Sequence, residues 1–125
     1  MDLRVRVFCD EQGVSREEEL DGLDDEALQI LALDESGVIA TCRVRDLGAE
    51  WKLERMAVEA RVRGLGVGAR LLAGAEEEAR AAGAQTMVLH AQRRAEPFYS
   101  ANGYAPEGEA FMDAGIEHIA MRKAL

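Results

Sequence analysis

The chain has 125 residues, 48 % of them hydrophobic and 31 % charged, which is the size and composition of one globular domain spanning residues 1–125. A net charge of −9 argues against a nucleic-acid-binding protein, because neutralising phosphates requires clustered Lys and Arg. Charged residues follow Met1 directly, so there is no signal-peptide pattern, and no apolar run approaches the ~20 residues of a membrane span. Cys9 and Cys42 lack metal-ligand spacing, so we expect reduced thiols in a cytoplasmic protein without a metal site.

The N-terminal half is predicted to hold one helix and three strands. Apolar residues that share a helical face favour a short helix over Leu3 to Glu11. Ala27–Leu33 and Val38–Val44 are rich in Ile, Leu and Val, and the "DESG" between them ends in Gly37, which can adopt the positive φ of a hairpin turn. Trp51–Val58 has the composition of a third strand, so an antiparallel meander is expected.

A strongly acidic segment lies between the expected helix and the first of these strands. From Asp10 to Glu26 there are nine acidic residues against Arg16 alone, so this segment carries −8 of the net charge of −9. One interpretation is a solvated loop with a helical turn, since runs of charge usually face water. The other is an acidic rim that attracts a cationic substrate, and Glu11, Asp21 and Asp24 are candidates for lining it.

The pattern becomes helical after the third strand. Apolar residues at helical spacing predict a helix over residues 66–82, which Gly83 ends. With the strand before it and a short apolar strand over Thr86–His90, this helix forms a strand–helix–strand unit with an expected right-handed crossover. The remaining elements are a helix over residues 96–102 and two strands, 108–112 and 117–122.

The stretch "RVRGLGVGARLL" (61–72) places three glycines at alternate positions at the start of a helix. Glycine costs about 1 kcal/mol relative to alanine inside a helix, so these glycines require a reason. The first turn of a helix presents unpaired N–H groups and a partial positive charge, and glycine lets an anion approach them closely. We therefore expect a phosphate group here, with charge added by Arg61, Arg63 and Arg70.

Three phosphate-binding motifs compete for this stretch. The nucleoside-triphosphate P-loop requires a lysine after the glycines, and none is present. The dinucleotide fingerprint is nominally matched by Gly64, Gly66 and Ala69, but the preceding strand is third in a meander and no acidic residue ends the next strand. The third motif, R-x-x-G-x-G directly after a strand, is matched by Arg63, Gly66 and Gly68.

This third motif resembles the acetyl-CoA pyrophosphate loop of the GNAT superfamily of N-acetyltransferases. Further segments, "VFCDEQGV", "LERMAV", "LHAQ", "FYSANGY" and "GIEHIAM", occur in the order and spacing of its ElaA-like branch. The resemblance covers nearly the whole chain. It implies an α+β fold with a central mixed, mostly antiparallel sheet flanked by helices. It also implies transfer of an acetyl group from acetyl-CoA, as co-substrate, to a primary amine by direct attack in a ternary complex.

The resemblance further implies which residues bind the donor. In GNAT proteins the strand before the loop splays from the following parallel strand, and pantetheine pairs with its free edge. Here that edge is Met56, Ala57 and Val58, with an N–H near Met56 polarising the thioester carbonyl. Gln92 stands where many relatives carry an asparagine that contacts pantetheine. The pyrophosphate is assigned to the backbone of Arg63, Gly64, Leu65, Gly66, Val67, Gly68 and Ala69.

Candidate catalytic residues follow from the demands of amine acetylation. Tyr99 matches the GNAT tyrosine that lies near the cofactor sulfur and can donate a proton to it; the alternative is a core tyrosine packed beside Phe98. An alkylammonium with a pKa near 10.4 must lose a proton before attack, so a base is needed. The candidates are Glu54, His90 and His118, each of which could instead be structural, and water could relay the proton. A protein that binds acyl-CoA as a sensor or assembly part, without turnover, is the alternative function.

The start of the chain leads to an expectation about assembly. GNAT domains usually open with a strand before the first helix, and the predicted helix at Leu3 leaves no room for one. Ala27–Asp34 would then form a bare and strongly apolar sheet edge. We therefore expect either a homodimer that covers this edge or a native N-terminus further upstream.

Overall fold

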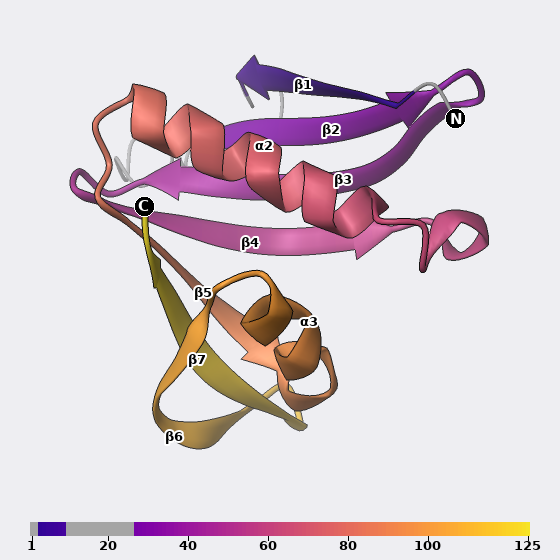
Figure 1. Ribbon diagram of the computed structural model, residues 1–125. Coiled ribbons are helices and arrows are strands. Elements are labelled where there is room, and N and C mark those ends of the chain that lie inside the picture. Colours follow the sequence, from indigo (N-terminus) through magenta and orange to yellow (C-terminus); the bar gives the residue numbers. More distant parts are fainter. Residues whose placement is uncertain (1–2, 10–26) are drawn as a thin grey trace, which may run out of the picture.

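The computed structural model describes residues 3–9 and 27–125, which form one sheet with helices packed on it (Figure 1). In this part of the chain the strand order is β1-β2-β3-β4-β5-β7-β6, and every neighbouring pair is antiparallel except β4 and β5, which are parallel. The strands are β1 (Arg4–Cys9), β2 (Ala27–Asp34), β3 (Gly37–Asp46), β4 (Glu50–Val58), β5 (Thr86–Gln92), β6 (Ala105–Asp113) and β7 (Ile116–Ala124). The helices are α2 (Val67–Ala81) and α3 (Glu96–Ala101), with short 3₁₀ turns η1 (Ala60–Val62) and η2 (Arg93–Ala95).

Most of the predicted elements are confirmed. The meander of β2, β3 and β4 is present, and Gly37 at the β2–β3 turn has φ +117°. The unit β4–α2–β5 has the expected parallel strands, and α3, β6 and β7 follow in the predicted order. The last two strands are longer than the predicted 108–112 and 117–122, because they pair with each other over most of their length. A mixed, mostly antiparallel sheet is therefore the correct fold class.

The predicted helix at the N-terminus is wrong. Residues 4–9 form strand β1, which pairs antiparallel with β2 from Arg4 opposite Leu33 to Cys9 opposite Leu28. The segment "RVRVF" alternates charged and apolar residues, and this period of two is the strand signal that outweighs the weak helical spacing. The first strand of the sheet is therefore present in this chain.

This correction removes the reason for expecting a dimer or a missing upstream strand. β2 is not an edge, since β1 covers it, and Arg4 and Arg6 of β1 are exposed. The opposite edge strand, β6, contains Pro106 and has an irregular register between Glu107 and Phe111. Charged residues, proline and irregularity at an edge discourage pairing between chains, so both described edges are protected.

Helix α2 packs across β1, β2, β3 and β4, whereas α3 packs against β5 and β6 (Figure 1). The buried apolar face of α2 is formed by Leu71, Leu72, Ala75 and Ala79, and it meets Ile30, Cys42 and other core residues of the sheet. Burial raises the pKa of the Cys42 thiol to about 12, so this free cysteine is a neutral core residue. Neither described helix is long and apolar enough to cross a membrane.

The divergence of β4 from β5 is the feature that positions the site. The two strands are paired only from Glu50–Thr86 to Leu53–Leu89, although β4 continues to Val58 and β5 to Gln92. At this point β4 shifts register against β3, and Arg55 has a left-handed φ of 54°. Such a bulge bends its strand, so residues 54–58 have no strand partner on the β5 side within the described chain.

The packing of β1 on α2 can be tested at Gly74. A Cβ at this position would lie 2.6 Å from Val5 Cγ1, so we expect Gly74→Ala to lower the melting temperature by a few degrees. The clash costs roughly 1–3 kcal/mol, more than the ~1 kcal/mol gained in helix propensity. In a Val5→Ala background the same change should be neutral or stabilising. Equal stabilisation in both backgrounds, measured by calorimetry, would contradict the placement of β1.

Candidate active site

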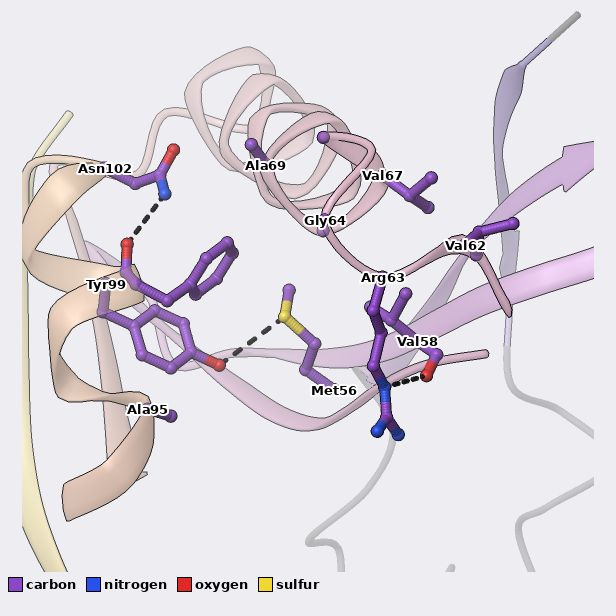
Figure 2. A pocket seen from close by; sticks show the side chains of 13 residues that line it. Met56, Val58, Val62, Arg63, Gly64, Val67, Ala69, Ala95, Tyr99 and Asn102 are labelled. Carbon is purple, nitrogen blue, oxygen red and sulfur yellow. Dashed lines mark hydrogen bonds between the residues drawn. The ribbon is translucent and has the colours of Figure 1, made fainter. Parts of the chain in front are cut away.

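A cavity of about 580 Å³ opens between the end of β4, the start of α2, and α3 (Figure 2). One wall comes from β4 and the following turn, one from the glycine turn and α2, and one from the α3 segment. The lining residues are Met56, Val58, Val62, Arg63, Gly64, Gly66, Val67, Gly68, Ala69, Ala95, Phe98, Tyr99 and Asn102. The cavity thus lies beside the strand edge that β5 leaves unpaired.

The glycine turn at one end of the cavity is built to present backbone. Gly64 and Gly66 have φ of +83° and +82°, and nothing lies within 4 Å of the position where a Cβ would stand on either residue. Gly66 is the N-cap of α2, no side chain caps the helix, and no acidic residue occupies its first turn. The first N–H groups of α2 are therefore unpaired and suited to an anion, and the phosphate site itself stays a prediction.

Gly68 has a different role, because its φ is not left-handed. A Cβ on Gly68 would lie 3.2 Å from Phe98 Cζ and 3.6 Å from Val58 Cγ2. The glycine therefore lets α3 and β4 approach the first turn of α2 closely. This contact joins the three walls of the cavity.

The three arginines near the turn differ in how they are held. Arg63 lines the cavity, and its Nε donates to the Val58 carbonyl oxygen at 3.1 Å (Figure 2). Arg61 instead bonds Ser36 and makes ion pairs with Asp34 at 3.5 Å and Glu59 at 3.3 Å. Arg70 is exposed on α2 outside the cavity lining. Arg63 is therefore the arginine best placed to add charge at this end.

Backbone directions at the end of β4 agree with a free edge facing the cavity. The Glu59 N–H donates to the Ile39 carbonyl oxygen at 2.8 Å, which directs Glu59 toward β3. Because successive residues of a strand point their polar groups to alternate sides, those of Val58 point away from β3. The bond from Arg63 to the Val58 carbonyl is made on that outward side.

Tyr99 spans the cavity from α3 to this strand edge. Its hydroxyl points at Met56 Sδ (Figure 2), with the two atoms 3.6 Å apart, and its side chain is buried. Burial, and next the nearby Cys42, raises the pKa of Tyr99 to about 12. Proton transfer from this phenol to a thiolate with an ordinary thiol pKa of about 8.5 would be strongly uphill. The hydroxyl is therefore suited to hydrogen-bond donation rather than to complete proton transfer.

The three candidate bases lie together on the sheet face opposite α2. Glu54 and His90 follow the last β4–β5 pair, Leu53 and Leu89, whose side chains are buried on the α2 face. Since side chains alternate along a strand, Glu54 and His90 point to the other face at the mouth of the gap. His118 stands opposite Gln92 on β7, which puts it diagonally beside His90.

Contacts distinguish the three groups. The Glu54 carboxylate lies 3.9 Å from Lys52 Nζ. His90 packs edge-on against Phe111 with ring centroids 5.1 Å apart, and burial, then Lys52 and His118, lower its pKa below the ordinary 6.5. His118 Nδ1 lies 2.8 Å from the Ile116 carbonyl oxygen, and because a carbonyl oxygen can only accept, Nδ1 is the donor in this bond.

Some predicted donor-binding residues lie outside the cavity lining. Ala57 and Leu65 are exposed, and Gln92 borders a smaller cavity of about 330 Å³ beside Arg93 and Glu117. The lining includes four residues that the sequence argument did not assign: Val62, Ala95, Phe98 and Asn102. Phe98 and Asn102 belong to the "FYSANGY" segment, so this motif could have indicated that both residues lie at the cavity. The acidic segment, with Glu11, Asp21 and Asp24, lies outside the described residues.

Comparison with known proteins gives the family. Residues 3–125 match the family described as "Acetyltransferase (GNAT) domain". The chain is 38 % identical over 122 residues to YjcF of Bacillus subtilis (strain 168), named as an uncharacterized N-acetyltransferase, covering 97 % of this chain and 87 % of YjcF.

Solved structures share the fold. A GNAT family acetyltransferase from Elizabethkingia anophelis, solved with acetyl-CoA bound, has a TM-score of 0.75 at 14 % identity, with 99 % of each chain covered. Escherichia coli ElaA has a TM-score of 0.75 at 21 % identity, covering 97 % of this chain and 99 % of ElaA. At this identity ElaA is a structural neighbour, and membership of an ElaA-like branch stays a prediction. The chain belongs to the GNAT acetyltransferase family, whose members are N-acetyltransferases that use acetyl-CoA as the acetyl donor.

Proposed function

We propose that this protein transfers the acetyl group of acetyl-CoA to a small primary amine by direct attack in a ternary complex. The amine nitrogen forms a bond to the thioester carbon, the C–S bond breaks, the nitrogen loses a proton and the sulfur gains one. The observation that carries the proposal is the gap between β4 and β5. It separates a glycine-lined cavity on the α2 face from three possible proton acceptors on the opposite face.

The residues of the cavity fit the donor. The open backbone at Gly64 and Gly66, the uncapped start of α2 and Arg63 suit a pyrophosphate. The unpaired edge of β4 from Met56 to Val58 suits the amide groups of pantetheine, which can bond to it as a neighbouring strand would. Acetyl-CoA supplies the activated thioester, and the chain's own role is to bind it in an extended conformation along this edge.

Two groups are proposed to stabilise charge in the reaction. The backbone N–H at Met56, beside the left-handed Arg55, polarises the thioester carbonyl, which is stabilisation by a preorganised donor. The Tyr99 hydroxyl donates a hydrogen bond to the sulfur as negative charge develops there. Its direction toward Met56 supports this role, and its raised pKa keeps it protonated throughout.

His90 is the proposed base. It stands level with Glu54 at the mouth of the gap, and its lowered pKa keeps the imidazole neutral and able to accept a proton at pH 7. Glu54 forms an ion pair with Lys52, and His118 lies two residues before Ala120, the β7 residue opposite His90. We also propose that the acceptor carries a positive charge, because the acidic segment would attract it. Glu54 and Asp113 add negative charge near His90.

Donor binding is predicted to depend on the charge at Gly66. With acetyl-CoA at 100-fold excess over its Kd, binding should stabilise the protein by about 2.7 kcal/mol. Gly66→Asp should abolish the rise in melting temperature, because the carboxylate repels the pyrophosphate. Gly66→Asn is the matched control, since it has the same size and also tolerates a left-handed backbone. It should keep a clear part of the rise; equal shifts in both variants would contradict this anion site.

Turnover is predicted to depend on the Tyr99 hydroxyl. Release of the free thiol from acetyl-CoA, measured with a panel of amines, should occur only when an amine is present. In this assay Tyr99→Phe should lower kcat about 10- to 100-fold, which is the effect of losing a hydrogen bond to a charged group. The Kd for acetyl-CoA should change little, because only one hydroxyl is lost. An absence of amine-dependent release would favour the sensor function. An unchanged kcat, with chemistry rate-limiting, would remove the role of Tyr99.

The proposed base predicts a pH dependence. Protonated His90 cannot accept a proton, so the advantage of wild type over His90→Asn in kcat/KM for the amine should fall as pH drops through the lowered pKa of His90. At pH values well above the lowered pKa of His90 the ratio should be constant, at about 10²-fold. Taking the ratio cancels the titration of the amine itself. The fall of kcat/KM at low pH should persist in His118→Asn. If this fall is lost in His118→Asn and kept in His90→Asn, His118 is the base.

A further inference from the structure

A buried polar cluster lies behind Tyr99, away from the reacting groups. Among the described residues, Glu76 of α2 is the one charged residue that is buried, with 5 % of its surface exposed. Its two carboxylate oxygens are both used: the Tyr104 hydroxyl donates to Oε2 at 2.9 Å, and Lys123 Nζ donates to Oε1 at 3.0 Å. We call Glu76, Tyr104 and Lys123 the Glu76 cluster.

The Glu76 cluster is bonded directly to the end of α3. Lys123 Nζ also donates to the Asn102 carbonyl oxygen at 3.0 Å, and Asn102 Nδ2 donates to the Phe98 carbonyl oxygen at 2.8 Å. The Tyr104 N–H donates to the Tyr99 carbonyl oxygen at 3.0 Å, and the two tyrosine rings meet edge-on with centroids 5.9 Å apart. The backbone that carries Tyr99 is thus held by residues of α2 and β7.

The fit around Lys123 is close. A Cβ on Gly103 would lie 3.1 Å from Lys123 Cε and 3.4 Å from its Nζ, so the turn after α3 leaves room for this side chain and little more. α3 has only six residues, too short to be stable by itself, and its position must come from such contacts. At its other side, Phe98 touches the first turn of α2 at Gly68.

Energetics favour a geometric role for the cluster. A buried ion pair usually contributes little net stability compared with apolar residues of similar size, because both charges lose their hydration. Its directional bonds, however, define how far α3 stands from α2. The same two helices carry the Tyr99 hydroxyl and the anion-binding turn at opposite ends of the cavity.

We infer that the Glu76 cluster is a positioning device, which sets the Tyr99 hydroxyl at bonding distance from the sulfur of a donor whose pyrophosphate is held at the start of α2. This inference rests on the proposed function of Tyr99. Glu76, Tyr104 and Lys123 do not line the cavity, so the cluster acts through α3.

Kinetic coupling between the cluster and Tyr99 tests this inference. Tyr104→Phe removes one hydroxyl and leaves the Glu76–Lys123 bond, so the variant should fold. It should lower kcat about fivefold, the effect of one lost hydrogen bond, and leave the KM for acetyl-CoA unchanged. In a Tyr99→Phe background the same change should have no further effect, because the hydroxyl being positioned is gone. Lys123→Met should behave in the same way, provided assays run well below its melting temperature.

Arg122→Met is the matched control. Arg122 precedes Lys123 on the same strand, and its exposed guanidinium pairs with Glu50 and Glu107, neither of them on α2 or α3. This variant should keep the wild-type kcat.

An equal loss of kcat from Tyr104→Phe in both Tyr99 backgrounds, or no loss in either, overturns the positioning role. Tyr99→Phe alone still reports on the role of Tyr99. If Tyr99→Phe itself leaves kcat unchanged, the proposed function of Tyr99 fails first and the inference with it.

Discussion

The site depends on one constraint, the loss of pairing between β4 and β5 after Leu53 and Leu89. Unpaired backbone groups normally cost free energy in a protein interior, so a gap within a sheet persists only where a ligand or solvent can satisfy them. The bulge at Arg55 produces the gap by bending β4, and its left-handed backbone is strain of the kind found at functional sites. The cavity, the three candidate bases and the unpaired edge of β4 are all arranged about this opening.

Helix α2 links the gap to the rest of the fold. Its apolar face covers β1 to β4, so the start of the helix is fixed relative to the end of β4. Three glycines allow helix α2 to begin and to pack where it does, each for a different physical reason. Gly66 supplies a left-handed N-cap, Gly68 admits Phe98 and Val58, and Gly74 admits Val5 of β1. Each would be costly to replace for a different reason.

Several parts of this protein could be predicted from local sequence. The glycine turn, the meander and the strand–helix–strand unit follow from residue types at short range: Gly37 and Gly66 have the left-handed backbone that their turns require. The uncapped start of α2 is likewise local, since it and its glycines are contiguous in the chain. At residues 4–9 the sequence alone favours a helix where the structure has strand β1, because apolar residues there fit both the helical and the strand period. Pairing with β2, a non-local contact, decides between them.

The sequence by itself determined the family and the glycine turn, because both reside in contiguous motifs whose backbone conformation is set within a few residues. Only the tertiary structure decided which side chains meet. Val62 and Asn102 join the cavity, Gln92 does not, and His90 reaches Phe111 across strands distant in the chain. The same holds for Glu76, whose surface-like "EEE" context conceals a carboxylate bonded to Tyr104 and Lys123. Such contacts depend on how the elements pack, and no local pattern specifies the distance between two helices.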